Sequence, residues 1–161
     1  MIPPTVQLVP NYIIMGRLGW LDTWLPLIVP SAANAFGIFW MRQYMYSLPS
    51  ELLDAARLDG AGEFGLFWRV VLPLARPALG ALALFVFTTS WNDFLLALVY
   101  LRTEERFTVQ LMISFIYRTR YQQNYHLLMS ASVLAIIPMM VLFIAAQRQF
   151  IAGLTLGSVR E

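Results

Sequence analysis

Residues 127–147 read LLMSASVLAIIPMMVLFIAAQ, a run of 21 positions without a charged side chain. A helix rises 1.5 Å per residue, so this run is about 31 Å long and matches the roughly 30 Å hydrocarbon core of a bilayer. The stretch therefore predicts a membrane-spanning helix. It decides the fold class, which we expect to be all-α.

The composition of the whole chain agrees with a membrane environment. Hydrophobic residues occupy 59% of the 161 positions and charged residues only 12%, about half the charged share of a typical soluble domain. Burying every apolar side chain would leave too few polar ones to cover the surface. Lipid must therefore act as part of the solvent.

Two further stretches are long and apolar enough to cross a bilayer. Residues 23–41 carry no charge, and residues 77–101 carry one, on Asp93. Trp20 and Trp40 would lie about 30 Å apart along one helix, which is the spacing of two interfacial aromatic belts. We therefore expect three spans, over 23–41, 77–101 and 127–147, in a multi-pass transmembrane helical bundle.

The first 16 residues are also uncharged, but they are too short to span comfortably and three prolines interrupt them. We interpret residues 1–16 as the remainder of an earlier span. The arginines divide almost equally between the two sides of the predicted spans, so the positive-inside rule does not settle the orientation.

The composition removes most kinds of enzyme chemistry. Cysteine is absent and His126 is the single histidine, so the sequence offers no cluster of soft metal ligands. The chain has no lysine and therefore no phosphate-binding P-loop for ATP. Its 11 basic residues are spread along the chain, which does not indicate a nucleic-acid partner. We expect a protein that is not an enzyme and that needs no metal or cofactor of its own.

The polar loop over residues 49–73 carries the most specific pattern. Its first part predicts a short helix, because Pro49 stands near the start, acids occupy the first turns and Gly60 is placed as a stop. A second helix is expected from Glu63 to Leu72, before Pro73. One face of the first helix combines Leu52, Ala55, Ala56 and Asp59.

The second helix of this loop carries aromatic side chains too large to leave in water. These are Phe64, Phe67 and Trp68. The small alanines of the first helix, in contrast, let another protein backbone approach closely. The loop is therefore expected to be covered by a partner.

This loop resembles the Glu-Ala-Ala loop of permeases from ABC importers. Asp54-Ala55-Ala56 is followed after three residues by Gly60, and after nine more residues come Val70, one residue, and Leu72-Pro73. Asp in place of Glu and Val in place of Ile are the two departures. Further segments narrow the resemblance to carbohydrate-uptake permeases of the maltose and glycerol-phosphate type: residues 35–39, 42–44, 90–94, 147–150 and 153–159.

The resemblance implies an inner-membrane permease subunit with three protein partners. These are a second permease subunit, a dimer of ATPase subunits that binds the ATP, and an extracytoplasmic solute-binding protein. Loop 49–73 and the C-terminal tail would be cytoplasmic, and loop 102–126 would face the binding protein. The loop residues implied in docking on the ATPase are Asp54, Ala55, Ala56, Arg57, Asp59, Gly60, Val70, Leu72 and Pro73.

The resemblance also implies that residues 1–161 correspond to the C-terminal part of such a permease, because family members usually have more spans. One alternative is a truncated remnant that does not transport, and another is a permease for a solute other than a sugar. A membrane-embedded enzyme would need clustered His, Asp, Glu or Ser on facing helices, and the predicted spans offer only Asp93.

Single residues leave further alternatives open. Trp91, Asn92 and Asp93 suit a solute pathway, since an aromatic ring and Asn or Asp groups would bind a sugar, but Asp93 could instead cap a break in the helix. Asp54 and Arg57 would form either an i, i+3 ion pair or a salt bridge to the ATPase. The loop itself could be a solvated amphipathic hairpin on the membrane surface.

Overall fold

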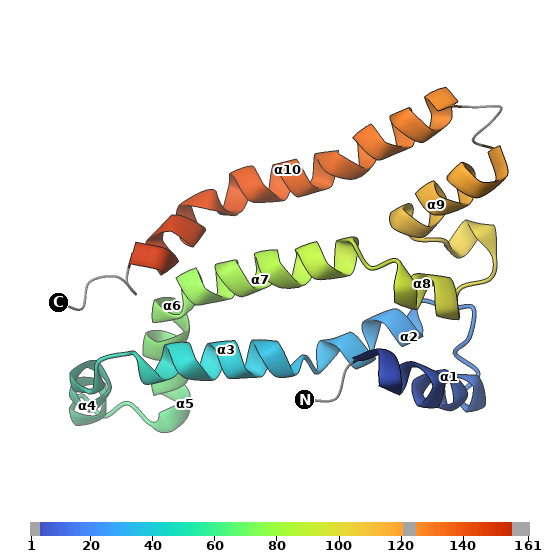
Figure 1. Ribbon diagram of the computed structural model, residues 1–161. Helices are drawn as coiled ribbons and strands as arrows, with labels where there is room; N and C mark the ends of the chain where they lie inside the picture. The colour runs from blue at the N-terminus through green and yellow to red at the C-terminus, as the bar shows by residue number, and fades with distance from the viewer. Residues whose placement is uncertain (1–3, 121–124, 156–161) are drawn as a thin grey trace. The chain divides into compact units, whose positions relative to one another are not determined.

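The computed structural model describes residues 4–120 and 125–155, and every regular element in these ranges is a helix (Figure 1). The predicted all-α fold class is therefore confirmed. The α-helices are α1 (Leu8–Arg17), α2 (Leu25–Ile28), α3 (Ala35–Tyr46), α4 (Ser50–Leu58), α5 (Glu63–Leu66), α6 (Leu72–Leu74), α7 (Arg76–Trp91), α8 (Leu95–Tyr100), α9 (Val109–Arg120) and α10 (Tyr125–Thr155). Short 3-10 turns cover Pro4–Gln7, Pro30–Ala32 and Glu104–Arg106, and a π-helical turn covers Phe67–Val71.

The chain divides into two compact units. The first unit combines Met1–Asn34 with Thr88–Met139, and the second combines Ala35–Phe87 with Met140–Glu161. Each unit therefore joins segments that lie far apart in the sequence.

The core of the first unit is built where α2, α8 and α9 meet. Ala97, Leu101 and Leu111 are almost completely buried, and Leu27 and Phe107 pack against them. The ring of Tyr12 on α1 stacks on that of Tyr100, with 6.3 Å between the ring centres. These contacts fasten the N-terminal segment to the end of α8.

In the second unit α3 lies beside α7. The rings of Phe36 and Phe85 are 4.5 Å apart at their centres. The indole nitrogen of Trp40 donates to the carbonyl of Ala78 at 3.3 Å, and the hydroxyl of Tyr44 donates to the carbonyl of Leu74 at 3.0 Å. Aromatic side chains of α3 thus hold the start of α7.

The helical run Glu63–Leu74 meets α7 at a sharp bend of 68°. Pro77 explains the bend, because a proline inside a helix has no N–H to donate and its ring collides with the carbonyl four residues earlier, here that of Pro73. The hydroxyl of Tyr44 supplies a donor to the carbonyl of Leu74 at this break. Loop 49–73 is therefore joined to α7 by a bend that the hydrogen bond from Tyr44 stabilises.

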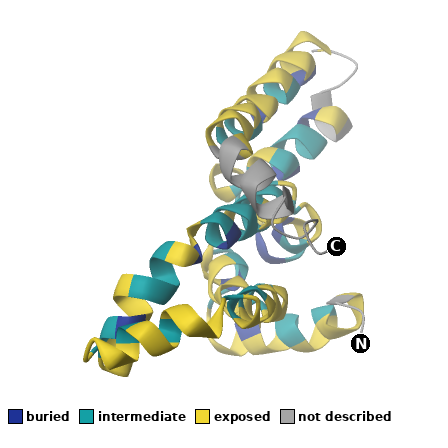
Figure 2. Ribbon diagram, turned by 90° about the vertical axis from the view of Figure 1, so that its left-hand side faces the viewer, coloured by how far each residue is buried: buried dark blue, intermediate teal, exposed yellow. Residues whose placement is uncertain are grey.

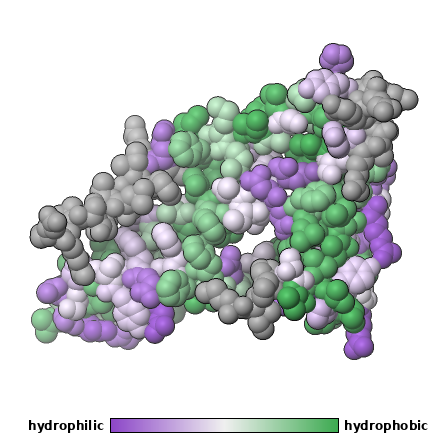
Figure 3. All heavy atoms as spheres, in the orientation of Figure 1, coloured by the Kyte–Doolittle hydropathy of each residue, from purple (hydrophilic) through white to green (hydrophobic). Residues whose placement is uncertain are grey.

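Within the described residues, Tyr125–Ala145 of α10 is the one unbroken helix that is long and apolar enough to cross a membrane, with a mean hydropathy of 2.6. The bent pair Glu63–Leu74 and Arg76–Trp91 meets the same criterion when the two are counted together. Exposed residues far outnumber buried ones (Figure 2), and the visible side of α10 is mainly apolar (Figure 3). Val133, Leu134 and Val141 are each more than 60% exposed, as expected of side chains that face lipid.

Two of the three predicted spans are not continuous helices. Residues 23–41 are divided into α2, the turn Pro30–Ala32 and α3, because Pro26 and Pro30 interrupt the helical hydrogen bonds. Residues 77–101 are divided between α7 and α8 by a break at 92–94. Residues 127–147 lie within α10 as expected.

The predicted N-terminal remnant contains the turn Pro4–Gln7 and most of α1. Residues 1–3 of that remnant, residues 121–124 of loop 102–126 and residues 156–159 of the predicted tail lie outside the described residues.

Candidate functional site

Loop 49–73 begins with α4, whose end is formed as the sequence predicts. Gly60 has a φ of +84°, a left-handed conformation that glycine adopts without the steric cost of a Cβ. The amide of Gly60 donates to the carbonyl of Arg57, and the amide of Ala61 donates to that of Ala56, both at 3.0 Å. This pair of bonds is a Schellman motif, which ends the helix and reverses the chain.

The face of α4 predicted to dock is open. None of the residues of α4 is buried, Ala55 and Asp59 are exposed, and Ala56 is half-buried. The isobutyl groups of Leu52 and Leu58 are 46% and 89% exposed. Two small residues between two exposed leucines make a shallow apolar surface, which a second protein could cover closely.

Arg57 joins α4 to α5 through two carboxylates. Its Nη1 lies 3.3 Å from Oδ1 of Asp54, and its Nε lies 3.2 Å from Oε1 of Glu63. Hydrogen bonding and charge from Glu63, and to a smaller extent from Asp54, raise the pKa of the Arg57 guanidinium. The structure therefore contains the predicted i, i+3 ion pair between Asp54 and Arg57, and it adds an ion pair with Glu63 that was not predicted.

The second helix of the loop differs from the prediction in where it ends. It was expected to stop at Leu72, but helical structure continues through α6 to Leu74. The reason is the π-helical turn Phe67–Val71, in which the amide of Leu72 donates to the carbonyl of Phe67, five residues back. This wider turn removes the conflict between the ring of Pro73 and the carbonyl four residues before it. Val70, Leu72 and Pro73 are half-buried in this segment.

The predicted pathway residues lie at the end of α7 and in the break that follows. The indole nitrogen of Trp91 donates to the carbonyl of Ala135 on α10 at 3.1 Å. The amide nitrogen of Asn92 donates to the carbonyl of Thr88 at 2.8 Å. The three residues are thus placed together, but each makes a different local contact.

Asp93 caps the helix after the break. Its Oδ1 accepts a hydrogen bond from the amide of Leu96 at 3.1 Å, so its carboxylate satisfies one of the free donors at the start of α8. Of the two roles considered for Asp93, the structure contains the capping contact.

A cavity of about 320 Å³ lies beside the break. Its polar lining consists of Asn92, Gln110 and Ser132, all uncharged, and Nε2 of Gln110 donates to Oδ1 of Asn92 at 3.2 Å. Apolar side chains complete the wall: Ile113, Ala135, Ile136 and Met139. Of the three predicted pathway residues only Asn92 lines this cavity. The sequence did not predict Gln110 and Ser132 as lining residues, because their spacing along the chain follows no recognisable motif.

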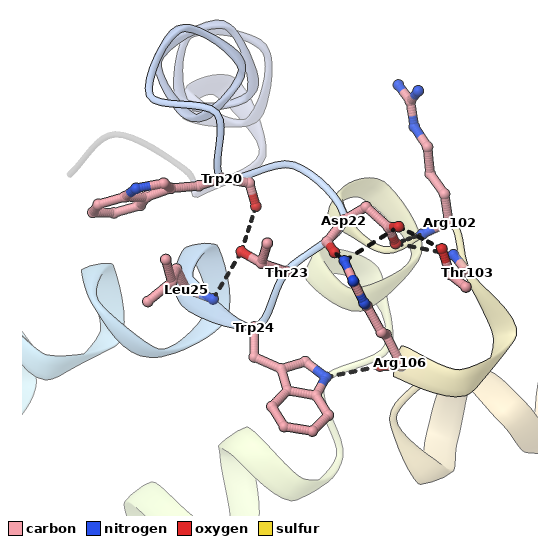
Figure 4. A network of polar contacts seen from close by, with 8 residues as sticks. All are labelled: Trp20, Asp22, Thr23, Trp24, Leu25, Arg102, Thr103 and Arg106. Carbon is pink, nitrogen blue, oxygen red and sulfur yellow. Dashed lines mark hydrogen bonds and ion pairs between the residues drawn. The ribbon is translucent and has the colours of Figure 1, made fainter.

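A second polar cluster surrounds Asp22 in the turn between α1 and α2 (Figure 4). Oδ1 of Asp22 accepts the amides of Arg102 and Thr103 at 2.8 and 2.9 Å. Oδ2 accepts the hydroxyl of Thr103 and lies 3.4 Å from Nη1 of Arg106. The hydroxyl of Thr103, the two amides and the charge of Arg106 lower the pKa of Asp22 to about 2. Among the described residues, no group of three His, Cys, Asp or Glu side chains could hold a metal ion.

A family model described as binding-protein-dependent transport system inner membrane component matches residues 1–155. The chain belongs to this family. Its α4–α5 hairpin and its α10, which contains the charge-free run 127–147, therefore belong to a member of this family.

Individual relatives share much of the sequence of this chain. It is 41% identical to the arabinooligosaccharides transport system permease protein AraQ of Halalkalibacterium halodurans, over 99% of this chain and 57% of that protein. It is 35% identical to the lactose transport system permease protein LacG of Rhizobium radiobacter, over 99% of this chain and 58% of that protein. The chain thus spans just over half the length of the curated relatives it matches.

A solved structure shares the fold. This chain matches a chain of a bacterial ABC transporter involved in the import of the acidic polysaccharide alginate, with a TM-score of 0.69 and 30% sequence identity. The match covers 88% of this chain and 55% of that chain.

Proposed function

We propose that the chain acts within a permease subunit of an ABC importer, where it contributes to the path of a sugar or related solute and couples that path to a separate ATPase. The observation that carries the proposal is the geometry of α4. A Schellman turn at Gly60 presents Ala55 and Ala56 on a helix with no buried residue, in the spacing of the Glu-Ala-Ala loop.

The contacts of α4 suit a docking element. Ala55 and Ala56 allow close approach of another backbone, and the exposed side chains of Leu52 and Leu58 offer apolar area to a cleft. Arg57 holds Glu63 across the turn, so the two helices of the hairpin would move together. This mode of binding is that of a helix seated in a groove.

The contacts at the bend would transmit a movement of α4 to the helices α3 and α7. Tyr44 and Trp40 of α3 donate hydrogen bonds to the carbonyls of Leu74 and Ala78 on either side of the bend. Displacement of the hairpin would therefore shift α3 and α7 as one body. ATP would be bound by the ATPase partner, and no cofactor would be needed in this chain.

The cavity beside Asn92 supports an uncharged, hydroxylated solute. Asn92, Gln110 and Ser132 offer amide and hydroxyl groups that both donate and accept, and the rest of the wall is apolar. This lining suits a sugar, whose hydroxyls need such partners and whose ring faces are apolar. A second permease subunit and an extracytoplasmic binding protein would complete the transporter.

The docking part is tested by Gly60→Val in the complete permease that contains this chain, with Gly65→Ala as the matched control on α5. We expect Gly60→Val to abolish co-purification of the ATPase and solute uptake, since valine does not tolerate a φ of +84°. The control should retain both, because a methyl group at Gly65 meets nothing within 4 Å. Retention of ATPase association and uptake in Gly60→Val would disprove docking through this turn.

The solute part is tested by Gln110→Ala and Ser132→Ala against a panel of labelled mono- and oligosaccharides. We expect a weaker apparent affinity for the transported sugar, with ATPase association unchanged. Equal uptake of all solutes by wild type and both variants would remove the cavity from the pathway.

A further inference from the structure

The helical run Glu63–Leu74 exposes an aromatic surface that the coupling role leaves unexplained. Phe64, Phe67 and Trp68 are 79%, 40% and 55% exposed, and we call these three side chains the aromatic face. The rings of Phe67 and Trp68 meet edge to face, with 5.7 Å between their centres. Their i, i+3, i+4 spacing places them on one side of the run, whereas Leu66 is buried.

The bend fixes the direction of this run relative to α7. The two axes are inclined by 68°. Twelve helical residues are about 18 Å long, so the run advances only about 7 Å along the axis of α7. If α7 crosses the bilayer, the run lies nearly flat at the level where α7 begins.

The side chains around the start of α7 are of the kinds found at a membrane–water interface. Trp40 and Tyr44 bond the carbonyls of Ala78 and Leu74 at the bend, and Trp and Tyr are enriched at the headgroup level of membrane proteins. The aromatic face belongs to the run Glu63–Leu74, which ends at this bend. Phe and Trp side chains there would reach the boundary between headgroups and acyl chains.

The net charge differs between the two helices of the hairpin, apart from Glu63, which is paired with Arg57. Arg69 and Arg76 are exposed, and the ion pairs among the described residues of this unit are made by Arg57. Exposed arginines beside apolar rings suit an anionic lipid surface. The first helix instead carries Glu51 and Asp54 against the single Arg57, with Asp59 directly after it, so its net charge is negative and such a surface repels it.

We propose that the aromatic face, together with Arg69 and Arg76, is an interfacial lipid anchor that holds the run Glu63–Leu74 in the headgroup region of an anionic leaflet. The anchor goes beyond the proposed coupling function. It leaves α4 free to bind a protein partner, and it would set the distance between α4 and the membrane surface.

The absence of cysteine from this chain makes the test direct. Phe64→Cys and Trp68→Cys, with Leu58→Cys on α4 as the matched control, are placed in the complete permease after any cysteine elsewhere has been replaced by serine. Each variant is reconstituted without ATPase into vesicles of phosphatidylethanolamine and phosphatidylglycerol. A membrane-impermeant maleimide is then added on the side where the loop is open. We expect labelling at positions 64 and 68 at least tenfold slower than at position 58.

The outcomes distinguish the anchor from its alternatives. Equal labelling rates at all three positions would overturn the anchor. Fast labelling at 64 and 68 that added ATPase suppresses would also overturn it, and would assign the aromatic face to the ATPase. Failure of the ATPase to protect position 58 would count against the proposed coupling and leave the anchor standing.

A measurement on the intact side chain covers the case in which the cysteine variants do not fold. Tryptophan fluorescence of wild type and Trp68→Phe is compared in vesicles that contain lipids brominated near the headgroup. We expect the difference spectrum, which isolates Trp68, to be quenched by these lipids at least twofold. An unquenched difference spectrum overturns the anchor.

Discussion

Asp22 and Thr103 are joined through both oxygens of the carboxylate. Oδ1 of Asp22 accepts the amide of Thr103 at 2.9 Å, and Oδ2 accepts its hydroxyl. Asp22 itself has a φ of 56°, a conformation that Asp and Asn tolerate better than other side chains with a Cβ. The pair fixes the turn between α1 and α2 against the segment that follows α8.

This pair predicts a response to acid. The folded-state pKa of Asp22 is about 2, below its ordinary value of 3.8. The ionised carboxylate therefore stabilises the folded state fully above pH 4, and this contribution is lost as the pH falls from about 4 to 2. We expect amide hydrogen exchange of residues 101–106 to be constant between pH 7 and 5, after correction for intrinsic rates, and to accelerate below pH 4.

Asp22→Asn supplies the control for the acid response. Asparagine keeps the left-handed backbone but lacks the charge and one acceptor. We expect faster exchange of residues 101–106 at pH 7 in this variant and no further protection to lose below pH 4. An acid response equal to that of wild type would assign the titration to another group.

Gly60 and Gly65 predict opposite effects of the same substitution. Alanine at Gly60 must adopt a φ of +84°, which costs about 1–2 kcal/mol for a residue with a Cβ. Alanine at Gly65 lies in a helix with open space around it, and should stabilise by about 0.5–1 kcal/mol. Thermal melting of the purified permease should fall for Gly60→Ala and be unchanged or rise for Gly65→Ala. A fall of equal size in both would contradict the role of the left-handed turn.

Features that depend on neighbouring residues could be predicted from the sequence. The charge-free run 127–147 is helical because its composition alone favours a helix in lipid, and Gly60 ends α4 because its missing Cβ permits the turn. A helix break capped by Asp93 was one of the alternatives that the sequence left open, but its position at 92–94 was not predicted. It depends on the side chains of Asn92 and Asp93, which bond nearby backbone groups and compete with the helix.

Contacts between distant segments could not be predicted in this way. Gln110 meets Asn92 and Asp22 meets Thr103 across long separations, and neither periodicity nor spacing indicates which polar groups will pair. Glu63 lies only six residues from Arg57, but the pair forms across the Gly60 turn, so helical spacing does not reveal it. Local patterns thus predicted the first helix of loop 49–73 and its turn at Gly60, whereas the cavity and the Asp22 cluster required the structure.

Asp93 predicts a difference between two substitutions that remove the same charge. Asn can accept the amide of Leu96 as the carboxylate does, whereas Ala cannot. We expect Asp93→Ala to lower stability by about 1 kcal/mol and Asp93→Asn to change it by a few tenths at most. Uptake by Asp93→Asn in the complete transporter should be retained. Loss of uptake with normal assembly would instead place the charge of Asp93 in the solute pathway.

Trp91 predicts that one hydrogen bond couples the end of α7 to α10. Its indole nitrogen donates to the carbonyl of Ala135, three residues before Pro138, whose missing N–H already weakens the helical bonding of that turn. Trp91→Phe keeps an aromatic ring but removes the donor, so we expect a loss of about 1 kcal/mol and faster amide exchange around Ala135. Trp20→Phe is the matched control, because the indole of Trp20 lies away from the neighbouring polar cluster (Figure 4). If both variants melt at the wild-type temperature, the bond to Ala135 does not hold these helices together.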